Sequence, residues 1–173
     1  FLLEDGVVTH NTTCIKEIIY NLELRGVTYA ICSFTGKAVA RIREVTGKKN
    51  PATMHRLISS SKKDKYDVKS DQFEKDIPLS DYEHVIIDEA SMVAEELLYD
   101  FLEAYPTIKR LTLVGDCNQL APIGWGNVLG QLVISETIPT YRLTTNYRVF
   151  TVDGETDGVI LNANAIIKHN PLC

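Results

Sequence analysis

The sequence predicts an α/β fold in which a mostly parallel sheet is covered by helices on both faces. Short apolar runs of strand length alternate with stretches whose apolar residues recur at helical spacing. Acidic residues follow two of these runs, at 88–89 and at 116. Strand–helix alternation is typical of parallel sheets, which bind ligands at the carboxyl ends of their strands. The residues that follow each strand are therefore the candidates for a functional site.

The expected elements follow one another along the whole chain. FLLED and VVTHN flank Asp5-Gly6, a pair typical of a type I′ turn, so residues 1–11 are expected to form a hairpin ending in His-Asn. Helical spacing begins at Thr13, and Gly26 ends that helix. Further strands are expected at 27–34, 83–90 and 108–116, a strand and turn at 138–149, and helices at 35–47, 51–58 and 94–105.

Residues 59–82 differ from the rest of the chain because they are polar, highly charged and poor in aliphatic side chains. They are expected to form an excursion outside the core, either a solvated loop or a small hairpin.

Composition limits the class of protein. The chain has 173 residues, a formal net charge of −5 and a sequence pI of about 5.4, which count mildly against a dedicated nucleic-acid module. No apolar run approaches the ~20 residues of a membrane span, and the first residues lack a basic leader, so a cytoplasmic protein without a membrane partner is expected. The cysteines lack metal-ligand spacing and are expected to be free thiols: Cys14, Cys32, Cys117 and Cys173.

VIIDEAS places two carboxylates after a buried strand. Magnesium takes few protein carboxylates and keeps its waters, so Asp88 alone can hold it. Glu89 can then orient or deprotonate an attacking water. The alternative is an ordinary acidic turn, and the next motif weighs against it.

LVGDCNQL supplies a second acid-ended strand, with Asp116 placed 28 residues after Asp88. Gln119 follows three residues later, and a glutamine beside a γ-phosphate can hydrogen-bond both phosphate and water. Taken alone this is an ordinary strand-to-turn segment, but the pair of motifs is far more specific.

SFTGKAVARI looks like a phosphate loop but lacks the first glycine and the final hydroxyl residue of one. Thr35, Gly36 and Lys37 instead open a helix after a strand, where backbone amides and a cation can meet a nucleic-acid phosphate. The alternative is a simple helix cap by Thr35. Thr53 and His55 add polar groups on a following short helix, although a lone histidine there is usually structural.

Arg148, in the stretch NYRV, is placed to reach a γ-phosphate across a cleft. A surface salt bridge is the default alternative for an isolated arginine.

Taken in order, TGKA, TMHRL, DEASM, GDxxQLxPIGxGN and NYR resemble the motifs of superfamily 1 helicases, specifically the RecD-like group of ATP-dependent DNA helicases. The resemblance implies a RecA-like P-loop NTPase fold, incomplete at both ends. It implies a first motor domain over 12–140 and the start of a second over 141–173. It also implies ATP and Mg²⁺ as cofactors, and 5′-to-3′ movement along single-stranded DNA.

The resemblance also implies roles by position. Thr12 and Asp88 would hold magnesium, and Asp88 and Glu89 would be the Walker B acids. The implied nucleotide-binding and catalytic set is Thr12, Thr13, Asp88, Glu89, Asp116, Gln119 and Arg148. The implied DNA path is lined by Thr35, Gly36, Lys37, Thr53 and His55.

The opening stretch departs from this pattern, because the helicases carry a glycine-rich loop ending in Gly-Lys directly before Thr12. Here His10 and Asn11 precede it. FLLEDGVVTHN instead resembles the C-terminal end of an intein, which ends in His-Asn before Cys, Ser or Thr. The resemblance implies that Asn11 closes a succinimide, with His10 as proton donor and Thr12 as nucleophile. The alternative is a degenerate ATPase-fold module that binds DNA or a protein partner without hydrolysis.

Overall fold

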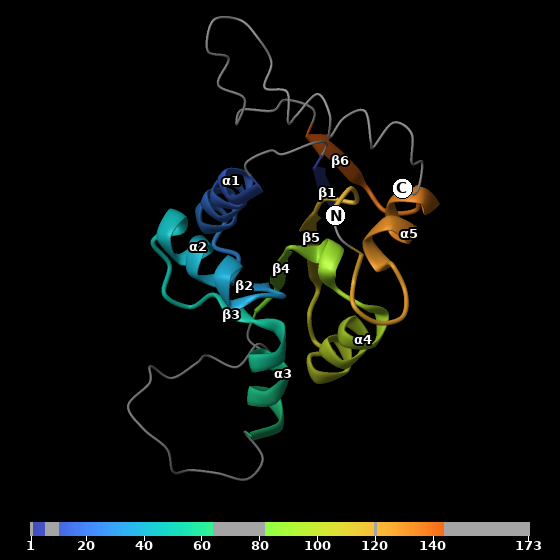
Figure 1. Ribbon diagram of the computed structural model, residues 1–173. Coiled ribbons are helices and arrows are strands. Elements are labelled where there is room, and N and C mark those ends of the chain that lie inside the picture. The colour runs from blue at the N-terminus through green and yellow to red at the C-terminus, as the bar shows by residue number, and fades with distance from the viewer. Residues whose placement is uncertain (1, 6–10, 64–81, 120, 144–173) are drawn as a thin grey trace, which may run out of the picture.

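A computed structural model describes residues 2–5, 11–63, 82–119 and 121–143 (Figure 1). Its centre is a six-stranded sheet in the order β3-β2-β4-β5-β1-β6, and every described pairing is parallel. The strands are β1 (Leu2–Asp5), β2 (Tyr29–Ser33), β3 (Ala52–Thr53), β4 (His84–Asp88), β5 (Arg110–Gly115) and β6 (Thr140–Leu143). The predicted α/β class with a parallel sheet is confirmed.

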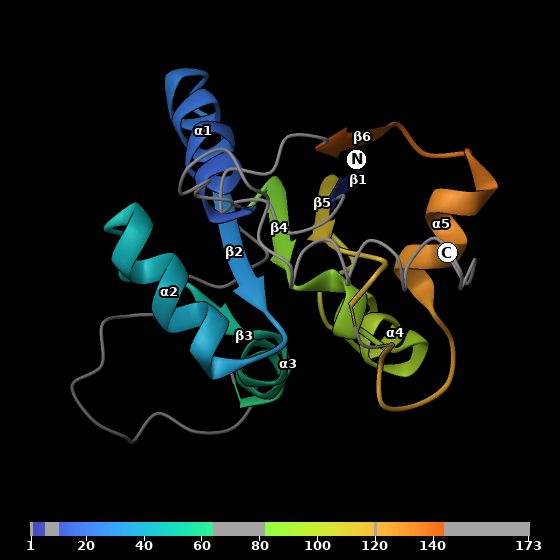
Figure 2. The ribbon, with the colours of Figure 1, turned by 45° about the horizontal axis from the view of Figure 1, so that its top comes forward.

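Helices cover both faces of this sheet (Figures 1 and 2). They are α1 (Asn11–Leu24), α2 (Gly36–Thr46), α3 (Met54–Lys63), α4 (Glu95–Ala104) and α5 (Val128–Ser135), with a 3₁₀ turn η2 (Ala90–Met92). One buried cluster joins α1 and α2 to the sheet, and a larger one joins α3, α4 and α5 to the opposite face. None of the described helices is long and apolar enough to span a membrane.

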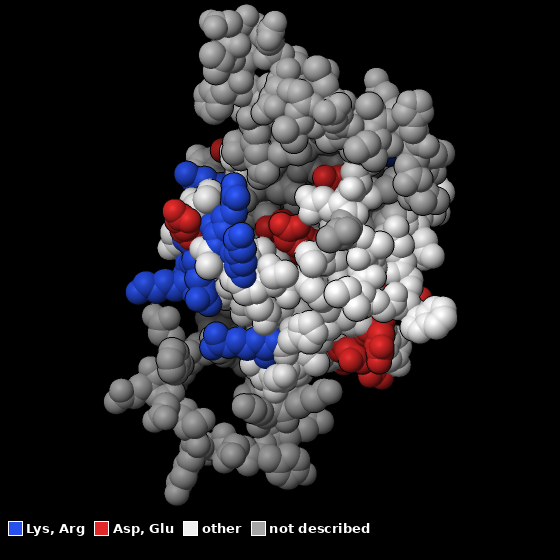
Figure 3. Space-filling model, viewed as in Figure 1, with Lys and Arg blue, Asp and Glu red and all other residues white. Residues whose placement is uncertain are grey.

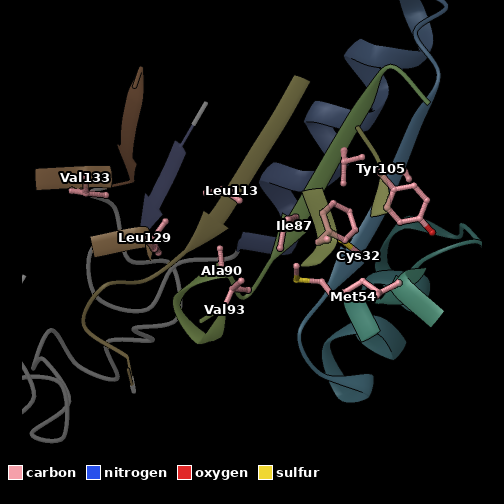
Figure 4. Close-up of a cluster of buried hydrophobic side chains, with 13 residues drawn as sticks. Cys32, Met54, Ile87, Ala90, Val93, Tyr105, Leu113, Leu129 and Val133 are labelled. Atoms are coloured by element: carbon pink, nitrogen blue, oxygen red, sulfur yellow. The ribbon is translucent and has the colours of Figure 1, made fainter. Parts of the chain in front are cut away.

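Alternation along β4 divides its side chains between the two clusters. Val85 and Ile87 pack into the larger cluster, whereas Ile86 packs against α1 and α2. Figure 4 shows Ile87 in the larger cluster, with Met54 of α3 and Tyr105 at the end of α4. Burying an isoleucine contributes about 1.5–3 kcal/mol, so a continuous apolar run is what a strand covered on both faces requires.

The boundaries of α2 follow from its end residues. The Thr35 hydroxyl accepts a hydrogen bond from the Ala38 amide at 3.1 Å, which caps the helix. Gly47 adopts φ +69°, and its amide donates to the Arg43 carbonyl at 2.9 Å. The helix expected at 35–47 is therefore confirmed, together with its reasons for starting and stopping.

The prediction of an N-terminal hairpin is wrong for the residues that the structure describes. Leu2 pairs in parallel with Leu113 of β5 and with Thr140 of β6, so both edges of β1 are occupied. No edge remains for an antiparallel arm, and Asn11 begins α1 instead of ending a strand. Insertion between two strands completes two backbone ladders, whereas a hairpin arm completes one. His10 lies outside the described residues.

Other differences arise where polar composition hides regular structure. Residues 59–63 belong to α3, in which the Ser60 hydroxyl donates to the Arg56 carbonyl and the Ser61 hydroxyl donates to the Ile58 carbonyl. Residues 64–81, most of the expected excursion, lie outside the described residues. The sequence also gave no expectation of α5, which Asn127 caps through the Gly130 amide at 3.0 Å.

Candidate functional site

Two acid-containing turns lie at the carboxyl edge of the sheet, after β4 and β5 (Figure 2). The two strands are neighbours, with Ile87 opposite Leu113. Asp88 and Asp116 are each only 5% exposed. The structure thus brings the two predicted motifs, 28 residues apart in sequence, to one edge.

Asp88 is held in place by its own turn. Its carboxylate accepts a hydrogen bond from the Glu89 amide at 3.0 Å. Ser33, the last residue of β2, lies opposite Asp88 in the parallel register. Cys32 is fully buried beside them, and burial, followed by the negative charge of Asp88, raises the pKa of its thiol. Cys32 is therefore a protonated packing residue and not a nucleophile.

Glu89 differs from Asp88 in backbone and exposure. Its φ of +55° and ψ of 40° are left-handed, a conformation that non-glycine residues rarely adopt and that costs of order 1 kcal/mol. This turn directs the chain into η2, and the Met92 amide donates to the Glu89 carbonyl at 3.1 Å. Glu89 is half-buried. The pair therefore consists of one buried, fixed carboxylate and one that solvent can reach.

The turn after β5 is similarly tight. The Asp116 carboxylate accepts from the Asn118 amide at 2.9 Å, and the Asp116 carbonyl accepts from the Gln119 amide at 3.1 Å. The side chain of Gln119 is exposed. A Cβ added to Gly115 would lie 2.9 Å from the Ser91 amide nitrogen, so only glycine lets the two turns pack this closely.

Among the described residues, two buried hydroxyls at this edge have no hydrogen-bond partner: those of Ser33 and Ser91. Unpartnered buried polar groups are costly, and a bound polar ligand or hydrated ion would satisfy them. A carboxylate with adjacent hydroxyls suits magnesium, which combines few protein oxygens with water and phosphate. In the part of the chain that is described, no three His, Cys, Asp or Glu side chains gather into a metal site. The donor set at Asp88 and Ser33 thus fits Mg²⁺ with phosphate.

The remaining nucleotide-site predictions are tested only in part. Asn11 and Thr12 form the first turn of α1, and Thr13 is exposed. His10 and Arg148 lie outside the described residues. Their predicted roles stay predictions.

The predicted nucleic-acid residues come together from two segments. Ser33 pairs with Thr53, so the start of α2 and the start of α3 lie side by side. Gly36, Lys37 and His55 are exposed. Figure 3 shows Lys and Arg side chains gathered on the side of the molecule that carries α1 and α2. A basic surface is thus present although the whole chain is acidic.

Phe34 joins this group, although none of the predicted motifs pointed to its side chain. Its ring lies edge-on to that of His55, with centroids 5.8 Å apart and planes at 64°. Its place in the sequence, as an aromatic residue between a buried strand and a helix cap, is the feature that could have identified it as a site residue.

A hollow of about 610 Å³ lies elsewhere, where the chain runs from the end of α5 into β6. None of the predicted site residues lines it; its lining is Val133, Glu136, Thr137, Ile138, Pro139, Thr140 and Arg142.

A family model described as an AAA domain matches residues 3–125. The ATP-dependent RecD2 DNA helicase of Deinococcus radiodurans is 34% identical over 147 residues, which cover 85% of this chain and 19% of that protein. The RecBCD enzyme subunit RecD of Mycobacterium tuberculosis is 28% identical over 184 residues, covering 94% and 31%. The chain therefore spans less than a third of the length of these curated relatives.

Solved structures show the same fold. Pif1 helicase from Candida albicans superposes with a TM-score of 0.58 and 20% identity, covering 86% of this chain and 36% of that one. Bacteroides Pif1 bound to single-stranded DNA gives 0.54 and 20%, covering 87% and 39%.

Proposed function

Because the chain belongs to the AAA domain family, we propose that it supplies the first motor domain of a RecD-like superfamily 1 DNA helicase. The fold is the RecA-like helicase core, a parallel sheet with helices on both faces. The proposed activity is ATP hydrolysis coupled to 5′-to-3′ movement on single-stranded DNA. The proposed division is a first domain over 12–140 and the start of a second over 141–173; β6 carries the first sheet on to Leu143.

The observation that carries this proposal is the pair of acid-ended turns on neighbouring parallel strands. Asp88, buried and fixed by the Glu89 amide, would hold magnesium, which neutralises phosphate charge when bound. Glu89, half-buried, would orient the attacking water. Thr12, Thr13, Asp116, Gln119 and Arg148 complete the proposed nucleotide site.

The proposed DNA path crosses the starts of α2 and α3. Thr35 caps α2, and the first backbone hydrogen bond of the helix runs from the Val39 amide to the Thr35 carbonyl. The amides of Gly36 and Lys37 therefore lie before that bond, at the open end of the helix. Such amides favour a phosphate, and the Lys37 side chain adds a positive charge. Thr53 and His55 lie beside them through the pairing of β2 with β3.

We further propose that residues 1–11 are the C-terminal tail of an intein. The Asn11 side-chain amide attacks its own carbonyl carbon, the Asn11–Thr12 bond breaks, and Thr12 leaves with a free amine. His10 would protonate the departing nitrogen. Before that step the Thr12 hydroxyl would accept the upstream flank as an ester, which then shifts to the amine. Ligation would restore Gly-Lys-Thr-Thr, the end of a phosphate loop.

A second candidate is favoured by the position of β1. The strand Leu2–Asp5 lies between β5 and β6 and leads toward α1, where a strand preceding a phosphate loop belongs. The family match also begins at residue 3. On this view His10 and Asn11 replace Gly-Lys, and the chain is a degenerate ATPase module that binds DNA or a protein without hydrolysis.

The nucleotide site is tested by restoring the loop. Residues 6–11 are replaced by a glycine-rich loop ending in Gly-Lys, and Mg-ATP binding is measured by calorimetry. The proposal expects at least about tenfold tighter binding than the parent chain, since the lysine and loop amides contact phosphate directly. Asp88→Asn in the same background should remove the magnesium dependence. Unchanged binding after restoration would contradict the nucleotide site.

The intein is tested by the reading frame upstream of the Phe1 codon. An open frame with splicing motifs that starts at Cys or Ser, just after a glycine-rich loop ending in Gly-Lys, supports it. A nearby start codon without such a frame supports the degenerate module instead.

A further inference from the structure

We infer that the loop at 123–126 and the outward face of α4 form a docking surface for a positively charged segment of a partner protein that carries a bulky apolar side chain. We call this the Trp125 surface, and it consists of Ile123, Trp125 and the exposed side chains of α4. None of these residues belongs to the proposed nucleotide site or DNA path, so the inference is independent of the proposed helicase activity.

Large apolar side chains are displayed to solvent on this surface. Ile123 is 94% exposed and Trp125 is 90% exposed, and α4 adds Tyr99 and Leu102, which are also exposed. A single exposed apolar residue is ordinary, whereas a group of them beside polar side chains is typical of an interaction surface. Tryptophan and tyrosine are also the residues that most often carry the binding energy of protein interfaces.

The loop is fixed onto the start of α4. The Glu95 amide donates a hydrogen bond to the Trp125 carbonyl at 3.1 Å. Gly124 and Gly126, on either side of Trp125, adopt φ values of +133° and +84°, and a Cβ on Gly126 would lie 3.0 Å from the Cβ of Glu95. Tyr99 lies one turn after Glu95, on the same side of the helix. The indole is therefore presented beside α4 from a fixed backbone, which lowers the entropic cost of binding.

The charge of this surface is negative. α4 carries four acidic residues and no lysine or arginine, and residues 117–127 carry no charge. Figure 3 shows Asp and Glu side chains gathered on the side of the molecule where Figure 1 places α4, away from the basic surface at α1 and α2. Glu95 and Glu96 stabilise the start of the helix, but Asp100 and Glu103 lie beyond its first turn and gain nothing from the helix dipole.

This charge selects the kind of partner. A nucleic-acid backbone needs basic side chains, and the acids of α4 repel it even though an aromatic ring is present. A symmetric pair of identical chains would bring two acidic faces together, which is unfavourable. A segment with lysine or arginine around an apolar anchor matches both the acids and the exposed indole.

The test uses the fluorescence of the 173-residue chain, in which Trp125 is the only tryptophan. The probe is a synthetic peptide of about 14 residues that combines lysine with leucine at helical spacing. In a second peptide serine replaces each leucine, and in a third glutamate replaces each lysine. The first peptide should shift the emission of Trp125 to shorter wavelength and protect it from quenching by acrylamide. The other two should do neither at the same concentration.

Variants are compared through the anisotropy of the labelled lysine–leucine peptide. Trp125→Ala should weaken binding at least about tenfold, as for an anchor residue of an interface, and Trp125→Phe should recover part of the loss. Tyr20→Ala is the matched control, because Tyr20 is 57% exposed on α1 and its loss should leave the affinity unchanged. Glu96→Gln should weaken binding about twofold, whereas Glu44→Gln, which removes an exposed charge from α2, should not.

Several outcomes would overturn the inference. Protection of Trp125 by none of the peptides would do so, as would equal protection by the serine or the glutamate peptide. Protection by an oligothymidylate would assign the surface to DNA instead. Protection that increases with the concentration of the chain alone would assign it to a second copy. None of these results bears on ATP hydrolysis, so the proposed function is tested separately.

Discussion

Ser33 lies directly opposite Asp88 in the parallel register of β2 and β4, and its buried hydroxyl has no hydrogen-bond partner in the described part of the chain. Both side chains are on the sheet face that α1 and α2 cover, because they alternate in phase with Ile31 and Ile86. A hydroxyl left unsatisfied beside a buried carboxylate is better explained by a bound ligand than by stability.

Ser33→Ala tests this relationship through folding stability. Removing an unpartnered buried hydroxyl should leave the free energy of unfolding unchanged or raise it by up to about 1 kcal/mol, because the desolvation cost disappears. Thr112→Val is the matched control, since the Thr112 hydroxyl is buried and hydrogen-bonded to Nε2 of His84 at 2.7 Å. It should lower stability by about 1 kcal/mol. Urea unfolding measures both, and a comparable loss in Ser33→Ala would mean that its hydroxyl has a partner.

Gly115→Ala should destabilise the chain by about 1–3 kcal/mol, as expected for overpacking. The new methyl group would lie 2.7 Å from Cδ2 of Leu129 and 2.9 Å from the Ser91 amide nitrogen, and the backbone atom cannot move aside easily. Gly36→Ala is the matched control, because nothing lies within 4 Å of its added Cβ. Thermal unfolding of the two variants compares them directly; equal melting temperatures would contradict the close packing of the two turns.

The sequence predicts this fold where the local residue pattern determines the structure, and not where distant residues determine it. VIIDEAS and LVGD were identified because continuous apolar runs are required of strands buried on both faces. Residues 59–63 were missed because serine and lysine side chains conceal a helix whose hydroxyls bond to its own carbonyls. The misassigned N-terminal strand shows a different limit: its partners lie more than 100 residues away, at Leu113 and Thr140, and local turn preference at Asp5-Gly6 carried no information about them.

Some features of the candidate site could likewise be predicted from the sequence, and others could not. Asp88, Asp116 and Lys37 were predictable, since residue type and strand-end position suffice to place them. The unpartnered state of Ser33 and the ring contact of Phe34 with His55 were not, because both depend on the pairing of β2 with its two neighbours.

Thr35→Ala should destabilise the chain by about 1 kcal/mol, because the hydroxyl that caps α2 through the Ala38 amide is lost. Thr35→Ser retains the hydroxyl and should recover most of the loss. Chemical denaturation provides the measurement. If both variants were equally destabilised, the methyl group and not the cap would be the stabilising feature.

His84 should make folding stability depend on pH. Burial, and then the positive charge of Arg110, lower the pKa of His84 below its ordinary value of 6.5. Well above pH 6.5 the side chain is uncharged in both folded and unfolded chains, so it contributes no pH dependence there. As the pH falls below 6.5, the unfolded chain takes up a proton that the folded chain resists, and the free energy of unfolding decreases. The decrease ends only below the folded-state pKa.

The measurement is urea unfolding of the parent and of His84→Gln between about pH 7.5 and pH 5, the interval that brackets an ordinary histidine pKa. The variant should lose the part of the decrease that begins near pH 6.5, whatever its stability at neutral pH. A His84→Gln chain with the parent's full slope would contradict the role of His84 in the pH dependence.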